Sequence, residues 1–287
     1  MTEQSESRLR SDPEQAAQSD KALASRRIVV AAIIGLLAGF LAGMFGVGGG
    51  ILIVPALVLV LGVKQRLAHG TSLAAIIPIA VVGVVGYAAA GSVDWVAAVI
   101  LAAGSALGAV VGTQGLQRLP QRALRLAFSA FLIANAISLF LTLGSSGSQK
   151  SLSVATVLGL LLIGLFAGTI AGLLGVGGGV VVVPALVLLI SMGVAKAKGT
   201  SLAVIVPTAV VGTLRNLRAR NVDLVLAAVV GITGMASTYV GTKLSVEMSP
   251  RLSKSLFACL LIAIVATSLV GAKRSKDVVP EIGPTTS

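Results

Sequence analysis

Long apolar runs separated by short polar gaps recur along almost the whole chain. They fall near residues 28–45, 50–62, 71–90, 95–113 and 124–143, and again near 153–174, 179–192, 200–214, 224–242 and 255–271. Runs of about 18 to 20 residues are long enough to cross the hydrocarbon layer of a membrane as helices. The run at 51–62 would reach only about 18 Å, so the pattern predicts a half-helix there and in the corresponding run at 179–192.

The pattern occurs twice. Residues 35–59 return as residues 164–188 at a constant shift of 129, and 17 of these 25 aligned positions are identical. Each copy contains the glycine cluster GVGGG, followed by apolar residues and a proline. Such a duplication in a hydrophobic chain is typical of transporters in which two discontinuous helices face each other. Because five runs per copy is an odd number, the second copy is predicted to be inverted relative to the first.

Loop charge favours counting the runs on either side of each cluster separately. With ten segments and the N-terminus inside, the loops place 13 Lys and Arg residues inside and 6 outside. If each cluster merely interrupts one crossing, the same residues divide into 9 inside and 10 outside. Positive charge concentrates on the cytoplasmic side of membrane proteins, which favours ten segments. Loop charge leaves open whether the short segments are full crossings or re-entrant hairpins.

Composition places the chain among multispanning membrane proteins. Its mean hydropathy is +1.01, and 56% of its residues are hydrophobic while only 11% are charged. The net charge of +12 fits cytoplasmic loops better than nucleic-acid binding, because few aromatic residues are available for base stacking. The lone Cys259 excludes a disulfide framework and a cysteine metal site.

The predicted fold is therefore an all-α polytopic membrane protein with 8–10 transmembrane segments in two inverted five-segment repeats. Helices are expected to break at the glycine clusters. We expect a disordered cytoplasmic tail over residues 1–25, the first repeat over 26–150, the second over 151–272, and a cytoplasmic C-terminal tail over 273–287. The protein would lie in the plasma membrane with both termini in the cytoplasm.

The glycine clusters are the first candidate site. Glycine adopts backbone angles closed to other residues, and unpaired amides at the start of a helix bind anions. The alternative, close helix packing, suits the glycines that recur every four residues at 35, 39, 43, 164, 168 and 172. Three adjacent glycines exceed what packing needs. The candidate substrate-binding residues are therefore Gly46, Gly48, Gly49, Gly50, Gly175, Gly177, Gly178 and Gly179.

A second duplicated element is Gly-Thr-Ser-Leu, at residues 70–73 and 199–202. Its hydroxyls could cap a helix start or bind a ligand, and the two roles are compatible. The remaining candidate binding residues are Thr71, Ser72, Thr200 and Ser201. Prolines inside the apolar runs remove backbone donors and are candidates for helix breaks or gating: Pro55, Pro78, Pro184 and Pro207.

Other polar residues give weaker signals. Arg215 and Asn216 stand where the first copy has Gly86 and Tyr87, so they are candidate partners for an anion, although an arginine here more often marks an inner loop. His69, with Lys198 opposite it in the repeat, reads as a structural or solvated loop residue, and Asp94 and Asp223 as helix caps or interface anchors. No carboxylate lies in the middle of a predicted span, and no catalytic, ATP-binding, metal or cofactor motif is present. We expect no enzyme activity.

The paired segments GVGGGILIVPAL and GVGGGVVVVPAL, each followed by Gly-Thr-Ser-Leu, resemble the sulfite exporter TauE/SafE family over about residues 28–271. The resemblance implies a plasma-membrane permease for sulfite, organosulfonates or other small anions. Its substrate would lie between the glycine clusters and the Thr-Ser pairs, reached by alternating access. An anion-selective channel is the alternative function. A coupling ion, proton or sodium, and a homo-oligomer are compatible with this sequence.

Overall fold

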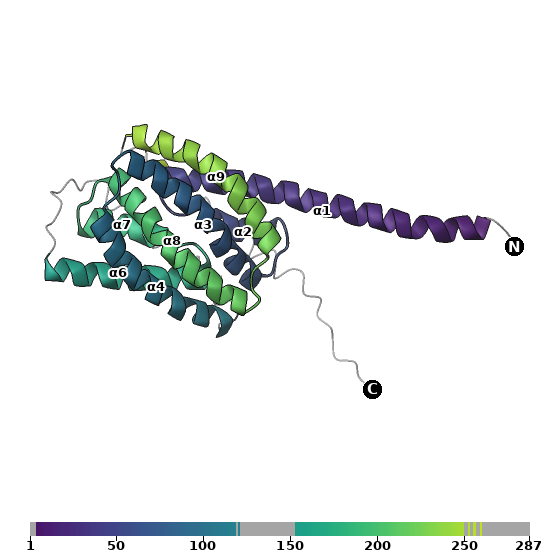
Figure 1. Cartoon of the computed structure of the whole chain (residues 1–287), viewed down its shortest axis with the longest axis horizontal. Helices are drawn as coiled ribbons and strands as arrows, with labels where there is room; N and C mark the ends of the chain where they lie inside the picture. The colour runs from purple at the N-terminus through teal and green to yellow at the C-terminus, as the bar shows by residue number, and fades with distance from the viewer. Residues whose placement is uncertain are drawn as a thin grey trace.

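The computed structural model describes residues 4–118, 120, 153–249 and the single positions 252, 255, 256 and 259, and this part of the chain is helical without strands. Figure 1 shows one bundle, beyond which the N-terminal half of α1 projects. The fifth run of each copy, at 124–143 and 255–271, lies wholly or mostly outside the described residues. The helices are α1 (Gln4–Phe45), α2 (Gly50–Leu59), α3 (Gln65–Ala89), α4 (Trp95–Arg118), α6 (Val154–Leu174), α7 (Gly179–Leu189), α8 (Val194–Arg218) and α9 (Leu224–Glu247).

Six segments of these helices are long and apolar enough to cross a membrane: Ser25–Phe45, Gln65–Ala89, Trp95–Gly115, Val154–Leu174, Val194–Arg218 and Leu224–Glu247. The multispanning character expected from composition is thus confirmed. Helices α2 and α7 have only 10 and 11 residues, or about 15 to 17 Å, which confirms the half-helix predicted after each cluster.

Helix α1 begins well before its apolar part. The sequence predicts a disordered tail over residues 1–25, whereas the structure describes helix from Gln4 onward. The reason is local, because this stretch is rich in Gln, Glu, Ala, Lys and Arg, all of which favour helix. The start of α1 is therefore a projecting helix rather than the expected coil (Figure 1).

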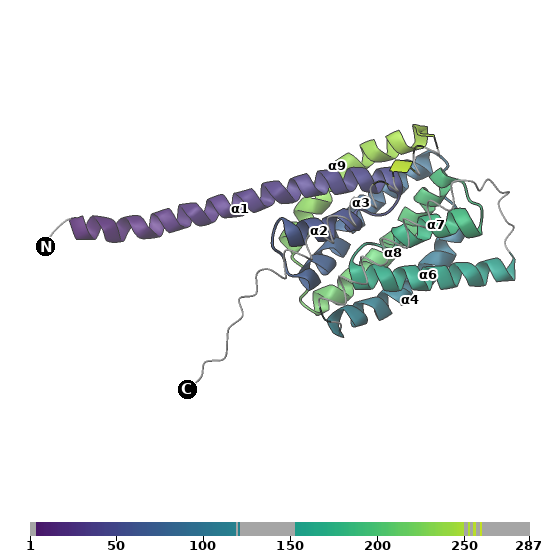
Figure 2. The ribbon, with the colours of Figure 1, turned by 180° about the vertical axis from the view of Figure 1, so that it is seen from behind.

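The helices form two groups that run in opposite directions. In the first group α1, α3 and α9 are parallel, since successive glycines of α1 at 35, 39 and 43 meet successive residues of α9 at 230, 234 and 238. In the second group α4, α6 and α8 are parallel by the same criterion. The groups meet where α3 packs antiparallel to α8, with Tyr87 beside Gly199 and Asn216 beside Gly70. Figure 2 shows the two groups on opposite sides of the bundle.

Glycine faces hold α1 against α9 and α4 against α6. A Cβ atom added to Gly39 would lie 2.6 Å from the Cα atom of Gly234, and one added to Gly168 would lie 2.7 Å from the Cα atom of Ser105. Backbones approach this closely only where side chains are absent. The packing role predicted for the glycines spaced four residues apart is therefore confirmed, and α4 adds a matching row at Gly104, Gly108 and Gly112.

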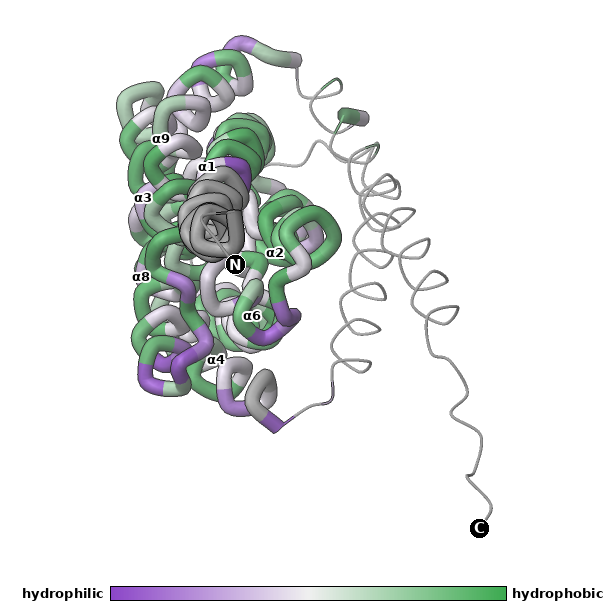
Figure 3. The backbone as a smooth tube through the Cα atoms, turned by 90° about the vertical axis from the view of Figure 1, so that its right-hand side faces the viewer, coloured by the Kyte–Doolittle hydropathy of each residue, from purple (hydrophilic) through white to green (hydrophobic). Residues whose placement is uncertain are grey.

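The outer surface is apolar. Large hydrophobic side chains such as Leu37, Val85, Leu107, Leu162 and Ile232 are exposed. Figure 3 shows apolar residues along most of the described tube, with short hydrophilic stretches between them. A soluble monomer rarely exposes apolar surface on this scale, so the surface is suited to lipid.

The glycine faces generate a stability prediction. Replacing Gly168 by Ala should destabilise the protein by about 1–3 kcal/mol, because the methyl group would overlap the backbone of Ser105. The control is Gly159→Ala on the same helix, where nothing lies within 4 Å of an added Cβ atom. Thermal unfolding in detergent checks both variants. Equal melting temperatures would contradict the packing assignment.

Candidate functional site

The chain turns back on itself at each glycine cluster. Helix α1 ends at Phe45, and Gly46, Gly48 and Gly49 have φ values of 73°, 78° and 77°, in the left-handed region that favours glycine. A Cβ atom on Gly49 would lie 2.8 Å from the carbonyl oxygen of Ala38, seven residues before the end of α1. The chain therefore folds back beside α1, and α2 runs back toward the start of α3. The predicted break at this cluster is observed as a hairpin.

The second cluster repeats this geometry between α6 and α7. Gly175, Gly177 and Gly178 have φ values of 66°, 84° and 77°. A Cβ atom on Gly178 would lie 3.0 Å from the carbonyl oxygen of Ala167. The four candidate prolines lie inside α2, α3, α7 and α8, and each helix continues past its proline. The interruptions thus occur at the glycines and not at Pro55, Pro78, Pro184 or Pro207.

The two clusters meet each other in the interior. A Cβ atom on Gly50 would lie 2.6 Å from the carbonyl oxygen of Gly175, and one on Gly179 would lie 2.7 Å from that of Gly46. The repeated serines complete the junction, since Ser72 Oγ donates to the carbonyl of Gly175 at 2.8 Å and Ser201 Oγ donates to that of Gly46 at 2.9 Å. Each copy thus satisfies a carbonyl of the other. The structure brings both clusters and both serines together.

The amides of the clusters find no acceptor among the described residues. Within the described residues, none of the backbone N–H groups at positions 47–51 and 176–180 donates a hydrogen bond. All these residues are buried. Most buried backbone amides in proteins have a hydrogen-bond partner, and leaving one without a partner costs free energy comparable to a lost hydrogen bond. Two sets of free donors at helix starts can receive an anion.

Two isoleucines cover the glycines at this junction. A Cβ atom on Gly48 would lie 3.1 Å from Ile205 Cδ1 and 3.2 Å from Ile76 Cγ2, and one on Gly177 would lie 3.2 Å from Ile205 Cγ2. Both isoleucines are fully buried. The junction is therefore closed and lined by apolar side chains in this conformation.

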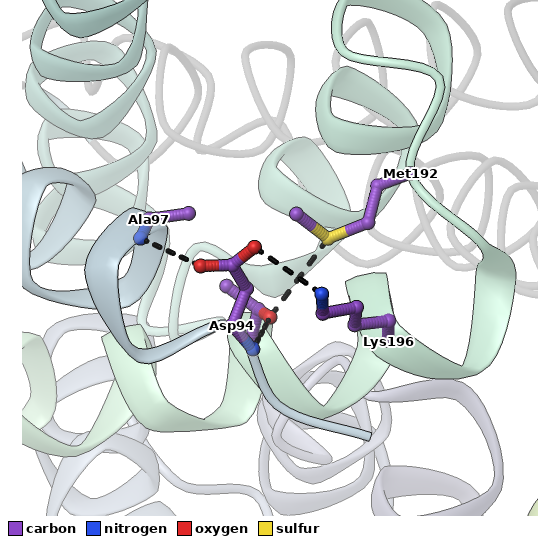
Figure 4. A network of polar contacts seen from close by, with 5 residues as sticks. Asp94, Ala97, Met192 and Lys196 are labelled. Carbon is purple, nitrogen blue, oxygen red and sulfur yellow. Dashed lines mark hydrogen bonds and ion pairs between the residues drawn. The ribbon is translucent and has the colours of Figure 1, made fainter. Parts of the chain in front are cut away.

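Each threonine binds backbone at the start of a helix in the other copy. Thr71 Oγ1 accepts a hydrogen bond from the amide of Asp223 at 2.9 Å, and Thr200 Oγ1 accepts one from the amide of Asp94 at 2.9 Å. Figure 4 shows Asp94 also capping the amide of Ala97 and facing Lys196, whose Nζ atom lies 3.5 Å from the carboxylate. These threonines tie one copy to the other, and a ligand role for their hydroxyls stays a prediction.

The capping role expected for the two repeated aspartates is confirmed. Asp223 Oδ1 accepts from the amides of Val225 and Leu226 at 3.1 and 3.0 Å. Asp94 Oδ1 accepts from Ala97 at 3.1 Å. Both carboxylates are thus used at helix starts.

Arg215 and Asn216 lie away from the glycine junction, near the end of α8. Arg215 is partly exposed, whereas Asn216 is buried with its Nδ2 atom donating to the carbonyl of Gly212 at 2.9 Å. The Cβ atom of Asn216 lies 3.1 Å from a Cβ atom added to Gly70. Their role as anion partners stays a prediction.

Sequence reasoning missed a buried lysine beside the first cluster. Lys198 looked like a loop residue, yet it is 3% exposed in α8, and its Nζ atom donates to the carbonyl of Met44 and to Ser245 Oγ, both at 2.7 Å. Its ammonium group also lies 5.8 Å from the centre of the Phe45 ring. His69, expected in a loop, is likewise fully buried, in α3. Their positions directly before each Gly-Thr-Ser were the available signal.

Known proteins provide an independent comparison. A probable membrane transporter protein of Xylella fastidiosa is 30% identical over 237 residues, covering 80% of this chain and 90% of the relative. Another from Methanocaldococcus jannaschii is 26% identical, with 80% and 90% coverage. The Bacillus subtilis protein YunE, also described as a probable membrane transporter protein, is 25% identical, with 83% and 94% coverage. No solved structure matches the chain.

The family comparison covers most of the molecule. The family model described as "Sulfite exporter TauE/SafE" matches residues 8–139 and 160–285, so both glycine clusters and both Gly-Thr-Ser-Leu elements lie in the matched regions. This is a family of membrane transporters and not of enzymes. The chain belongs to the sulfite exporter TauE/SafE family of membrane transporters.

Proposed function

We propose that this protein is a secondary transporter for small anions, with sulfite or an organosulfonate as substrate, bound between the two glycine clusters. The observation that carries the proposal is the pair of unsatisfied amide sets at residues 47–51 and 176–180, buried where the copies meet. An oxyanion offers several acceptor oxygens to such donors without requiring a salt bridge. The family description, which names sulfite export, supports this substrate class.

The proposed mechanism is alternating access by an inverted repeat. Its support is the direction of the helices, because α3 and α8 occupy equivalent places in the two copies and pack antiparallel. The reciprocal bonds from Ser72 and Ser201 give each copy the same contact with the other. Since the junction is fully buried, an anion could enter only after one group of helices moves relative to the other. A channel would instead need an open path through the isoleucines.

The proposed placement is the plasma membrane, with both termini in the cytoplasm and the copies spanning residues 26–150 and 151–272. Loop charge supports this orientation. The proposed partners are the anionic substrate and the lipid bilayer, and we propose no nucleic acid, metal or cofactor.

Flux measurements test the anion site. Gly48→Ala should lower the uptake of radiolabelled sulfite into proteoliposomes by about tenfold or more, since about 1.4 kcal/mol of lost binding is a factor of ten. The added methyl group would crowd Ile76 and Ile205 and displace the free amides. Saturable uptake with counterflow would identify a carrier, and single-channel currents a channel.

The matched control is Gly62→Ala. Gly62 also has a positive φ, 65°, but nothing lies within 4 Å of an added Cβ atom. It therefore bears the same kind of backbone strain without crowding the junction. Equal uptake by both variants, at equal amounts of folded protein, would refute the glycine junction as the binding site.

Single-cysteine labelling tests the inversion. In a Cys259→Ser background, cysteines at the repeat-equivalent loop positions 91 and 220 should react with membrane-impermeant thiol reagents from opposite sides. Position 91 should be accessible from outside intact cells, and position 220 only after the cytoplasmic face is exposed. Labelling of both positions from the same side would exclude an inverted repeat.

A further inference from the structure

The two copies differ in the polar groups that surround the end of their first helix. In one half, Lys198 and Tyr87 converge on the end of α1. At a shift of 129 residues, His69 corresponds to Lys198 and Asn216 corresponds to Tyr87. The same positions near the end of α6 thus carry an imidazole and a shorter amide in place of an ammonium group and a phenol.

At the end of α1 the polar groups are mutually satisfied. Tyr87 Oη donates to the carbonyl of Gly43 at 2.8 Å and lies 2.8 Å from Ser245 Oγ. Lys198 Nζ and Ser245 Oγ each donate to the carbonyl of Met44 at 2.7 Å. A positive charge is favourable here, because the carbonyls at the C-terminal end of a helix carry partial negative charge.

Among the described residues, several atoms of the corresponding polar groups in the other half have no hydrogen-bond partner. Neither imidazole nitrogen of His69 makes a hydrogen bond, although the carbonyl of Leu174 lies near the ring. The Oδ1 atom of Asn216 and the Oγ1 atom of Thr213 are also buried and unsatisfied. The position equivalent to Ser245 is Leu116, which has no hydroxyl group. Few buried polar atoms in native structures lack a partner, and a bound ion or a functional role is one reason for the exceptions.

The end of α6 offers carbonyl acceptors to His69. Within the described residues, no side chain donates to the carbonyls of Gly172 or Leu173, which correspond to Gly43 and Met44. The Leu174 carbonyl lies near the ring, and the side chain of Asn216, whose Cβ atom lies 3.1 Å from a Cβ atom added to Gly70, is beside the residue that follows His69. A neutral imidazole has one donor, whereas a protonated one has two and carries the charge that Lys198 carries in the other half.

We propose that His69 is a proton-binding site, the repeat counterpart of Lys198, and that its proton is the one coupled to anion transport. Proton binding forms one N–H bond on the imidazole and adds one positive charge, with no other covalent change. The coupling rests on the proposed anion site, whereas the proton site does not.

The location gives this charge an effect on the anion. A Cβ atom added to Gly175 would lie 2.7 Å from the Cα atom of His69, and one added to Gly46 would lie 2.6 Å from the Cα atom of Lys198. Each glycine cluster therefore has one of these two residues directly beside it. Protonation of His69 would place positive charge at both clusters, so proton and anion would favour each other's binding.

Charged groups around His69 come from several elements. On its own helix Arg66 lies one turn earlier, on α8 Arg215 adjoins Asn216, and Asp223 begins α9 with its amide bonded to Thr71. The Asp223 carboxylate caps the amides of Val225 and Leu226. Helix α6 presents the carbonyl of Leu174 to the ring.

Nuclear magnetic resonance can observe this site directly, because His69 is the one histidine among 287 residues. The full chain, purified through a tag without histidine and labelled with 15N-histidine, would be titrated in lipid nanodiscs between pH 4 and 9. We expect one imidazole that passes from neutral to doubly protonated in this range. Addition of sulfite should raise the titration midpoint. An imidazole that stays neutral at every pH would overturn the proposal, as would a response to sodium in place of protons.

Two substitutions test whether Asn216 affects the titration of His69. Asn216→Leu removes the Oδ1 acceptor and should lower the midpoint by about one pH unit, a tenfold loss of proton affinity. Tyr87→Phe removes the equivalent hydroxyl from the other half and should leave the midpoint unchanged. If both variants or neither moved the midpoint, the assignment of Asn216 as partner would fail.

Measurements of sulfite uptake distinguish the proposed proton coupling from the proposed anion site. Sulfite uptake by the wild-type protein should respond to an imposed pH gradient more strongly than uptake by His69→Lys or His69→Gln, since the protonation of sulfite itself is the same in all three. Equal responses would refute coupling while leaving anion transport intact. Absence of any wild-type flux would refute the proposed function, and the imidazole titration would still decide the proton site.

Discussion

The structure depends on a reciprocal pair of hydrogen bonds, in which a serine of each copy binds the glycine cluster of the other. Ser72 and Ser201 each donate to a carbonyl of the opposite copy, at the point where the backbone of that copy leaves the helix. Inside an apolar bundle, interrupted backbone must find partners within the protein, because lipid supplies none. The carbonyls of Gly46 and Gly175 have partners, whereas the nearby amides have none among the described residues. The junction is therefore rich in hydrogen-bond donors. Its backbones can approach this closely because the residues are glycines.

Helices from the two copies also pack closely against each other outside this junction. The glycine rows between α1 and α9 and between α4 and α6 join helices from different copies, so each half of the bundle contains a helix of the other. Thr71 and Thr200 add a further exchange at the starts of α9 and α4. In the proposed mechanism, the groups joined in this way would move as units.

Near symmetry makes the differences between the halves informative. The backbone angles of the two clusters agree within a few degrees, and the serine and threonine bonds recur with nearly equal lengths. Against this background, the replacement of Lys198 and Tyr87 by His69 and Asn216 stands out, because the same backbone frame holds a satisfied network at one end and unsatisfied atoms at the other. Unsatisfied buried atoms lower stability, so this difference between the halves points to a role other than stability.

The sequence by itself determined the membrane class, the family, the duplicated clusters and the glycine packing faces, because hydropathy, periodicity and local repeats record these directly. It also indicated a half-helix after the first cluster from length alone. Only the tertiary structure decided that the clusters touch, that Ser72 and Ser201 bond across the copies, and that the threonines cap remote helices. It alone placed Lys198 and His69 in the interior. Contacts between residues more than 100 positions apart depend on how helices pack, and burial of a charge near a helix start depends on which neighbours cover it.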